Sequence, residues 1–122
     1  MGLFDTTQLG LEQALFGATL RQRAIANTIA NANTASFKRS DVDFHSAQAD
    51  ALGAPDAQSR LRGLSFTTET DTASATRVDG NNVDIDQEMA NLSQTSLEYQ
   101  SLVTVARARM AMLQVAIGTR QS

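Results

Sequence analysis

The 122-residue chain contains no cysteine, no tryptophan and a single histidine, His45. Without cysteine, the protein can form neither a disulfide nor a catalytic thiolate. One histidine is too few for a histidine pair or a structural zinc site, so we interpret His45 as an exposed or packed imidazole. No apolar run approaches the length of about 18 residues that crosses a bilayer, and we predict no membrane span.

An excess of basic charge is also missing. The chain carries 10 basic and 13 acidic side chains, a net charge of −3, with a sequence pI of about 4.9. This balance gives no general phosphate-binding surface, so we expect no nucleic-acid partner. The first residues lack the basic segment and the continuous apolar segment of a secretory signal peptide, so we expect no cleaved signal of that kind.

Motifs of catalysis and metal binding are absent as well. The sequence has no P-loop, no G-x-G-x-x-G and no G-x-S-x-G that would place a nucleophile beside His45. The stretch from Asp79 to Glu88 superficially resembles a calcium loop, but Val83 and Ile85 occupy ligand positions and the glycine is misplaced. We therefore expect no catalytic, cofactor-binding or metal site, and no enzyme activity.

Two long heptad patterns are what the sequence does contain. The C-terminal pattern steps by three and four through Met89, Leu92, Ser96, Tyr99, Val103, Ala106, Met110, Leu113 and Ile117. We predict a helix over residues 84–117, with Asp84 as the N-cap, Asp86 as the alternative cap and Gly118 just past the end.

The N-terminal pattern steps in the same way through Leu11, Leu15, Ala18, Gln22, Ile25 and Ile29. It predicts a helix over residues 7–33, in which Gly10 and Gly17 each cost up to about 1 kcal/mol relative to alanine. Such a helix is marginal alone and needs a partner. We expect a mainly α protein, a single domain of residues 1–122, in which the two terminal helices pack as a coiled-coil pair.

Residues 34–82 have poor periodicity and many turn-forming residues, so we predict a loop-rich middle. The segment LSFTTET favours one short strand, and a short β-hairpin is compatible with this region. Asn33 is our candidate for a left-handed turn residue after the first helix. A self-contained helical hairpin is one reading of this organisation. We favour a pair that also packs on neighbouring copies, because the middle has few bulky apolar groups to cover both helices.

Two stretches resemble the signatures of the bacterial flagellar rod and hook axial proteins. The first signature is ANTIANANTASFKRSDVDF, residues 26–44, and the second is GNNVDIDQEMANLSQTSLEYQSLV, residues 80–103. The motif positions that the resemblance carries over are Asn27, Asn31, Asn33, Thr34, Phe37, Lys38, Asn82, Val83, Asp84, Glu88, Met89, Tyr99 and Gln100. The chain has Ala35 and Ser36 where the family usually has Pro-Gly.

The resemblance implies a structural subunit of the flagellar basal-body rod, and the short length fits the proximal rod. It implies polymerisation through the terminal helices, with copies of the chain, other rod proteins, the basal-body ring adaptor and the flagellar export apparatus as partners. It also implies a place in the periplasmic rod after type III export without a cleaved signal peptide. The alternatives are another short axial rod protein, or a cytoplasmic helical adaptor or export chaperone.

Overall fold

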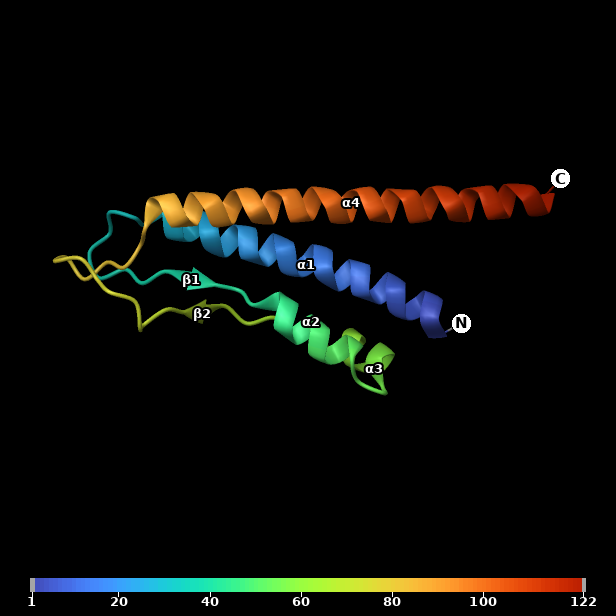
Figure 1. The fold of residues 1–122 in the computed structure, drawn as a ribbon, viewed down its shortest axis with the longest axis horizontal. Coiled ribbons are helices and arrows are strands. Elements are labelled where there is room, and N and C mark those ends of the chain that lie inside the picture. The colour runs from blue at the N-terminus through green and yellow to red at the C-terminus, as the bar shows by residue number, and fades with distance from the viewer. Residues whose placement is uncertain (1, 122) are drawn as a thin grey trace.

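A computed structural model of the protein describes residues 2–121, and the side chains of residues 6–118. The elements are α1 (Gly2–Ala30), β1 (Ser40–Asp41), α2 (Phe44–Leu52), α3 (Ala57–Arg62), β2 (Glu69–Thr70) and α4 (Ile85–Gln121). Figure 1 shows an elongated molecule in which α1 and α4 run side by side and the middle of the chain lies against α1. The predicted fold class, mainly α with long terminal helices, is confirmed. No helix in the described part of the chain is long and apolar enough to cross a membrane.

Helix α1 is the central element because it is covered from two directions. On one side Gln22 donates a hydrogen bond to Ser96 Oγ of α4 at 3.2 Å. On the other, Gln13 donates to the carbonyl of Leu61 in α3 at 2.9 Å. The predicted stripe is buried at Ala18 and Ile25 and half-buried at Leu11, Leu15 and Ile29.

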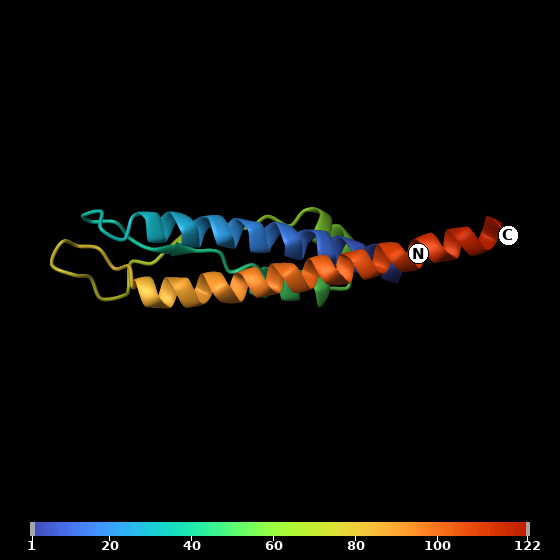
Figure 2. The ribbon, with the colours of Figure 1, turned by 90° about the horizontal axis from the view of Figure 1, so that it is seen from above.

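The buried face of α4 is narrower than the heptad pattern indicates. Leu92, Ser96, Tyr99, Val103, Ala106 and Leu113 are half-buried. Met89, Met110 and Ile117 are 48, 57 and 58% exposed, so α1 does not cover these three. Two reasons apply. The most deeply buried positions of α4 are Glu88 and Thr95, one residue before the heptad positions, and α4 continues past the N-terminal end of α1 (Figure 2).

The helix ends agree with the sequence only in part. Asp84 Oδ1 accepts a hydrogen bond from the Gln87 amide at 3.3 Å, as the capping pattern predicts, and Asp86 lies in the first turn. Gly118 does not end α4, which runs to Gln121; no atom lies within 4 Å of a Cβ built there, so no tertiary contact turns the chain. Helix α1 begins at Gly2 and ends at Ala30, whereas the pattern predicted residues 7–33.

The middle of the chain is more helical than predicted. Helices α2 and α3 were missed because each has few buried apolar residues, which are too few to set a period. Helix α2 begins where Asp43 Oδ1 accepts from the Ser46 amide at 3.3 Å. Strands β1 and β2 pair antiparallel, Ser40 with Thr70 and Asp41 with Glu69. They form no tight hairpin, because α2 and α3 lie between them in the chain.

Phe44 anchors this middle segment on α1. Its side chain is 1% exposed, contacts the Phe66 ring edge-on at a centroid distance of 6.0 Å, and sits over Gly17. A Cβ on Gly17 would lie 2.6 Å from Phe44 Cγ, closer than real Cβ contacts. Gly17 therefore weakens the helix locally but provides the notch that receives the largest fully buried side chain.

We expect Gly17→Ala to lower the free energy of unfolding by about 1–3 kcal/mol, because the new methyl group overlaps Phe44. The matched control is Gly10→Ala in the same helix, where a Cβ has 3.8 Å to its nearest neighbour. That substitution should stabilise the protein by up to about 1 kcal/mol through helix propensity. Urea unfolding followed by circular dichroism compares the two variants. Equal effects would contradict the close packing of Phe44 against Gly17.

Candidate functional site

The structure brings the two sequence signatures together at the end of α1. Asn81, fully buried, donates from Nδ2 to the carbonyls of Asn31 at 3.0 Å and Thr34 at 2.8 Å. Its Oδ1 accepts from the Val83 amide at 2.7 Å. One amide side chain thus forms hydrogen bonds with backbone groups from both signatures.

A tight turn at Arg77–Gly80 packs against the first signature. The Gly80 amide donates to the Arg77 carbonyl at 2.9 Å, and Gly80 has φ +83°. The Ser36 amide donates to the Asp79 carbonyl at 2.8 Å, and Lys38 Nζ donates to the Gly80 carbonyl. These hydrogen bonds hold the loop after α1 against the turn at Arg77–Gly80.

Ser36 adopts a conformation that favours glycine. Its φ is +63°, and it is the one non-glycine residue with positive φ in the part of the chain that the structure describes. The prediction that Asn33 provides the left-handed residue is therefore wrong; the turn places it three residues later. This is the position where the resembled family usually has glycine, which fits the geometry.

Asn82 links three segments. Its Oδ1 accepts from the Arg39 amide at 2.6 Å, and its Nδ2 donates to the Asp71 carbonyl at 2.8 Å. Its own amide donates to the Phe37 carbonyl at 3.4 Å. The start of α4 is thereby attached to the strand that leaves the first signature and to the chain that follows β2.

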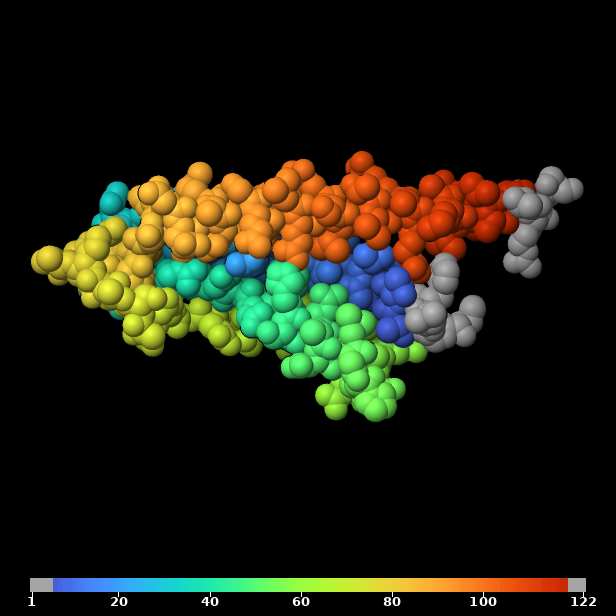
Figure 3. Space-filling view, viewed as in Figure 1, coloured from blue at the N-terminus to red at the C-terminus, as the bar shows by residue number. Residues whose placement is uncertain are grey.

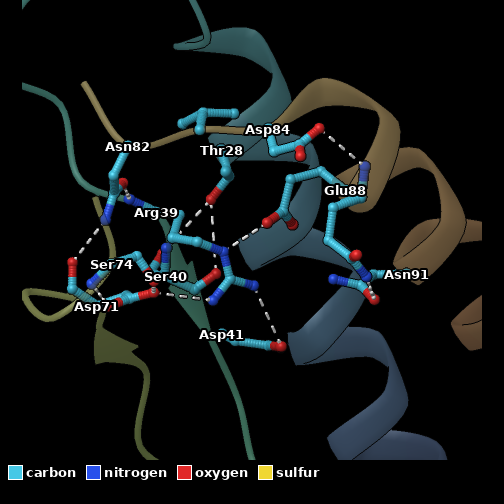
Figure 4. Close-up of polar contacts among 12 residues, drawn as sticks. Thr28, Arg39, Ser40, Asp41, Asp71, Ser74, Asn82, Asp84, Glu88 and Asn91 are labelled. Atoms are coloured by element: carbon cyan, nitrogen blue, oxygen red, sulfur yellow. Dashed lines mark hydrogen bonds and ion pairs between the residues drawn. The ribbon is translucent and has the colours of Figure 1, made fainter. Parts of the chain in front are cut away.

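Arg39 lies at the centre of this site, among carboxylates from α4 and from the two strand segments (Figure 4). Its Nε lies 2.5 Å from Glu88 Oε1, and its terminal nitrogens lie 3.6 Å from Asp41 and from Asp71. The Glu88 side chain is 1% exposed and the Arg39 side chain 21%. The hydrogen bond that Arg39 donates to Glu88 raises the pKa of Arg39 above its ordinary value, so Arg39 is held in its charged form.

Asp71 is fixed from its own side. Its carboxylate accepts from the Ser74 hydroxyl at 2.5 Å and from the Ser74 and Ala73 amides at 3.0 Å. These bonds, with a smaller contribution from the Arg39 charge, lower the pKa of Asp71 to about 2. Asp71 therefore stays ionised near neutral pH and faces Arg39 as a preorganised anion.

Apart from Asp84, which caps α4, the signature positions separate into two groups. Those that join the two signatures are Asn31, Thr34, Phe37, Lys38, Asn82, Val83 and Glu88. Asn27, Asn33, Met89 and Gln100 are exposed, and Tyr99 packs on the core cluster further along α4. The sequence analysis missed Arg39, Asn81 and Arg77, although Arg39 directly follows Lys38 and Asn81 directly precedes Asn82.

The side chains of this site form hydrogen bonds with backbone groups of segments that are distant in sequence. Arg77 donates to the carbonyls of Ala32 and Val83, one from each signature. Thr28 Oγ1 accepts from the Ser40 amide at 3.3 Å, which fixes β1 on α1. Among the described residues, no group of three or more histidine, aspartate or glutamate side chains is placed to hold a metal ion. The chemical role of this arrangement is to join the first signature to the start of α4 through the ion pair between Arg39 and Glu88.

Comparison with known proteins yields relatives over most of the chain. It is 34% identical over 113 residues to the flagellar basal body rod protein FlgB of Bacillus subtilis (strain 168), covering 84% of this chain and 86% of the relative. It is 32% identical over 122 residues to FlgB of Borrelia hermsii, covering 86% and 90%. It is 30% identical over 110 residues to FlgB of Yersinia enterocolitica, covering 77% and 80%. No protein-family model matches the chain.

Arg39→Met should lower the free energy of unfolding by about 2–3 kcal/mol, because Glu88 would remain buried as an unpaired charge. The control is Arg60→Met, which removes an arginine whose pair with Asp56 is more than half exposed. An exposed i, i+4 pair contributes at most about 0.5 kcal/mol. Chemical denaturation measures the free energy of unfolding of both variants. Equal losses would contradict the stabilising role of the Arg39–Glu88 pair.

Ser36→Gly should raise the free energy of unfolding by up to about 1 kcal/mol, because glycine adopts φ +63° without the strain that a Cβ brings. Ala35→Gly, one residue earlier and without positive φ, should instead lower it by about 0.5–1 kcal/mol. Thermal and urea unfolding read out both signs. A loss of stability in Ser36→Gly would contradict the strain.

Proposed function

The chain belongs to the family of the flagellar basal body rod protein FlgB, and on that premise we propose that it is a structural subunit of the proximal rod. The rod is the shaft through which a flagellum transmits rotation for motility. The observation that carries the proposal is the identity to FlgB proteins over most of both chains. The shape supports it, since an elongated pair of helices with an exposed apolar face suits a subunit that is completed by neighbours.

The exposed apolar face lies on α4. Its residues recur every three or four positions, are all exposed and, apart from Ser101, are apolar; we call them the outer stripe: Leu97, Ser101, Val105, Ala108 and Met112. This spacing puts them on one side of the helix, away from the buried positions Glu88 and Thr95. Figure 3 shows α4 along one edge of the molecule, with α2 and α3 at the opposite edge. A sustained apolar stripe on a surface helix marks an interaction face.

Assembly with neighbouring subunits would bury apolar surface that the isolated molecule leaves exposed. The small side chains on the buried faces of α1, among them Ala14, Ala18 and Ala24, give a thin core. Burial of further apolar surface, at about 25 cal/mol per Å², then stabilises helices that are marginal alone. In our proposal the covering surfaces are helices of other copies and of other rod proteins, with the basal-body ring adaptor and the export apparatus contacted at the base of the rod.

We place the subunit in the periplasmic part of the basal body, after export by the flagellar type III apparatus without a cleaved signal. The names of the relatives support the basal-body rod, and the export route follows from that assignment. The test is to purify intact hook-basal bodies, strip soluble protein and identify the chain by mass spectrometry. Its recovery in the rod fraction is expected. Intact basal bodies without it, and the chain confined to the cytosol, would overturn the proposal in favour of a cytoplasmic adaptor.

Met112→Asp should abolish motility and rod incorporation while leaving monomer stability within about 0.5 kcal/mol, because Met112 is exposed in the monomer and would be desolvated at a subunit contact. The control, Gln114→Asp, adds the same charge two residues later at another exposed position. Swarming assays and blots of purified basal bodies compare them. Normal motility of Met112→Asp would contradict the role of the outer stripe.

A further inference from the structure

Val78 has the most exposed large apolar side chain in the part of the molecule that the structure describes. Its exposed fraction is 109%, whereas the other exposed side chains of this kind range from 45 to 68%. It lies in the tight turn Arg77–Gly80, within the loop that connects β2 to α4 and forms the end of the molecule opposite to the C-terminus (Figure 1). Since the side chain buries no apolar surface in the monomer, it adds nothing to the stability of the fold.

The turn that carries Val78 is nevertheless held firmly by hydrogen bonds. The Arg77 amide donates to the Asn81 carbonyl at 2.7 Å, and the Ser36 amide donates to the Asp79 carbonyl at 2.8 Å. The Asn81 amide donates to Asp79 Oδ1 at 3.0 Å. The side chain of a valine is itself stiff, because it branches at Cβ. Val78 is therefore a preordered apolar knob, whose binding to another surface would cost little conformational entropy.

An apolar groove opens toward the other end of the molecule, between α1, α2 and α4. Its volume is about 460 Å³, and Figure 3 shows α1 uncovered there between α4 and the pair α2 and α3. Its apolar lining comes from all three helices: Gly10, Leu11 and Ala14 of α1, Phe44 and Leu52 of α2, and Leu102 of α4. Leu52 is 46% exposed, so the monomer leaves this wall of the groove incompletely covered.

The knob cannot reach the groove of its own chain. The turn packs against the residues that follow α1, where Arg77 donates to the Ala32 carbonyl. The groove lies at Gly10, which is 20 residues before the end of α1 at Ala30. At 1.5 Å per residue these two positions are about 30 Å apart. Only another molecule can therefore fill the groove.

The charges beside the knob and the groove are compatible with contact. Arg77 and Asp79 flank Val78 and lie 3.7 Å apart, and Glu98 at the edge of the groove lies 2.5 Å from His45 Nε2. Each of these charges has a partner in its own chain, so insertion of Val78 leaves no carboxylate buried alone. Arg77 is the cation of the turn and Glu98 the anion of the groove, so the two surfaces are complementary when Arg77 faces Glu98.

The groove also borders the face that we assign to subunit contacts. Glu98 and Leu102, which form its α4 wall, directly follow Leu97 and Ser101 of the outer stripe. A neighbouring subunit seated on the outer stripe thus lies next to the groove. Its occupant need not come from a separate partner.

We propose that the groove binds Val78 of a second copy of this chain. This rests on the proposed rod function, which sets copies side by side, and it adds a contact between the loop before α4 of one copy and the groove of the next. The two copies use different surfaces, so the contact is heterologous. Each copy inserts its own Val78 and offers its own groove, and the contact repeats around a ring or along a helix.

Val78→Asp tests the knob. As the sole copy in cells it should lower the yield of hook-basal bodies about tenfold, because the contact loses one buried valine. The purified variant should unfold at the same urea concentration as the wild type, since Val78 is exposed in the monomer. The matched control is Val78→Ile, which keeps an apolar, branched side chain and should assemble normally. A wild-type yield from Val78→Asp, or a loss of its monomer stability, would overturn the proposal.

Cross-linking tests the occupant, and the chain has no cysteine to interfere. In Leu52→Cys/Val78→Cys the two thiols are too far apart to bridge within one copy, but they meet between copies. Oxidised basal bodies should give a ladder of linked copies, whereas each single variant should give none. A photoreactive diazirine amino acid at position 78 should then label Gly10, Leu52 or Leu102 of the same chain. Labelling of a different rod protein, without a ladder, would overturn the proposal.

The same preparations separate this inference from the rod function. Absence of the wild-type chain from intact basal bodies would remove the rod function. Presence of the chain, with a normal yield from Val78→Asp and no ladder, would remove the contact between Val78 and the groove and leave the rod function intact.

Discussion

The ion pair between Arg39 and Glu88 constrains where the start of α4 can lie. Glu88 is almost completely buried, and a carboxylate in that position is costly unless a cation and hydrogen bonds compensate it. The cation comes from a residue 49 positions earlier, so the pair forms only when the first signature and the start of α4 are in register. Asn81 and Asn82 add hydrogen bonds that are satisfied in the same arrangement.

The opposite end of the molecule exposes apolar side chains instead of pairing polar ones. There α4 extends past α1, and its exposed side chains include Met110, Met112 and Ile117. Polar contacts of the kind that surround Arg39 are satisfied within one chain, whereas an apolar stripe stays incomplete until another surface covers it. A subunit whose polar contacts are satisfied at one end and whose apolar side chains are exposed at the other is suited to assembly with neighbours. This agrees with its place in the FlgB family.

Local patterns were enough to predict the terminal helices but not the elements between them. The heptad spacing identified both helices because their apolar residues recur over many turns. Helix α2 has two buried residues, Phe44 and Ala51, and its position depends on a notch at Gly17, which no local pattern reveals. Within the site, Asn82 and Glu88 were found through the family resemblance. Arg39 and Asn81 were not, because their partners lie more than 40 residues away in sequence.

Sequence alone determined the helical class, the cap at Asp84, the absence of disulfides and the family, since each depends on neighbouring residues or on a motif that can be read directly. Tertiary structure decided which residues of each stripe are covered, because burial depends on the length and position of the opposing helix. It also decided that Ser36 takes the left-handed turn, because the Ser36 amide donates to the Asp79 carbonyl of a distant segment. Helix α4 continues past Gly118, where no tertiary contact turns the chain. The pairing of Arg39 with Glu88 belongs to this second group, since only folding brings the two charges together.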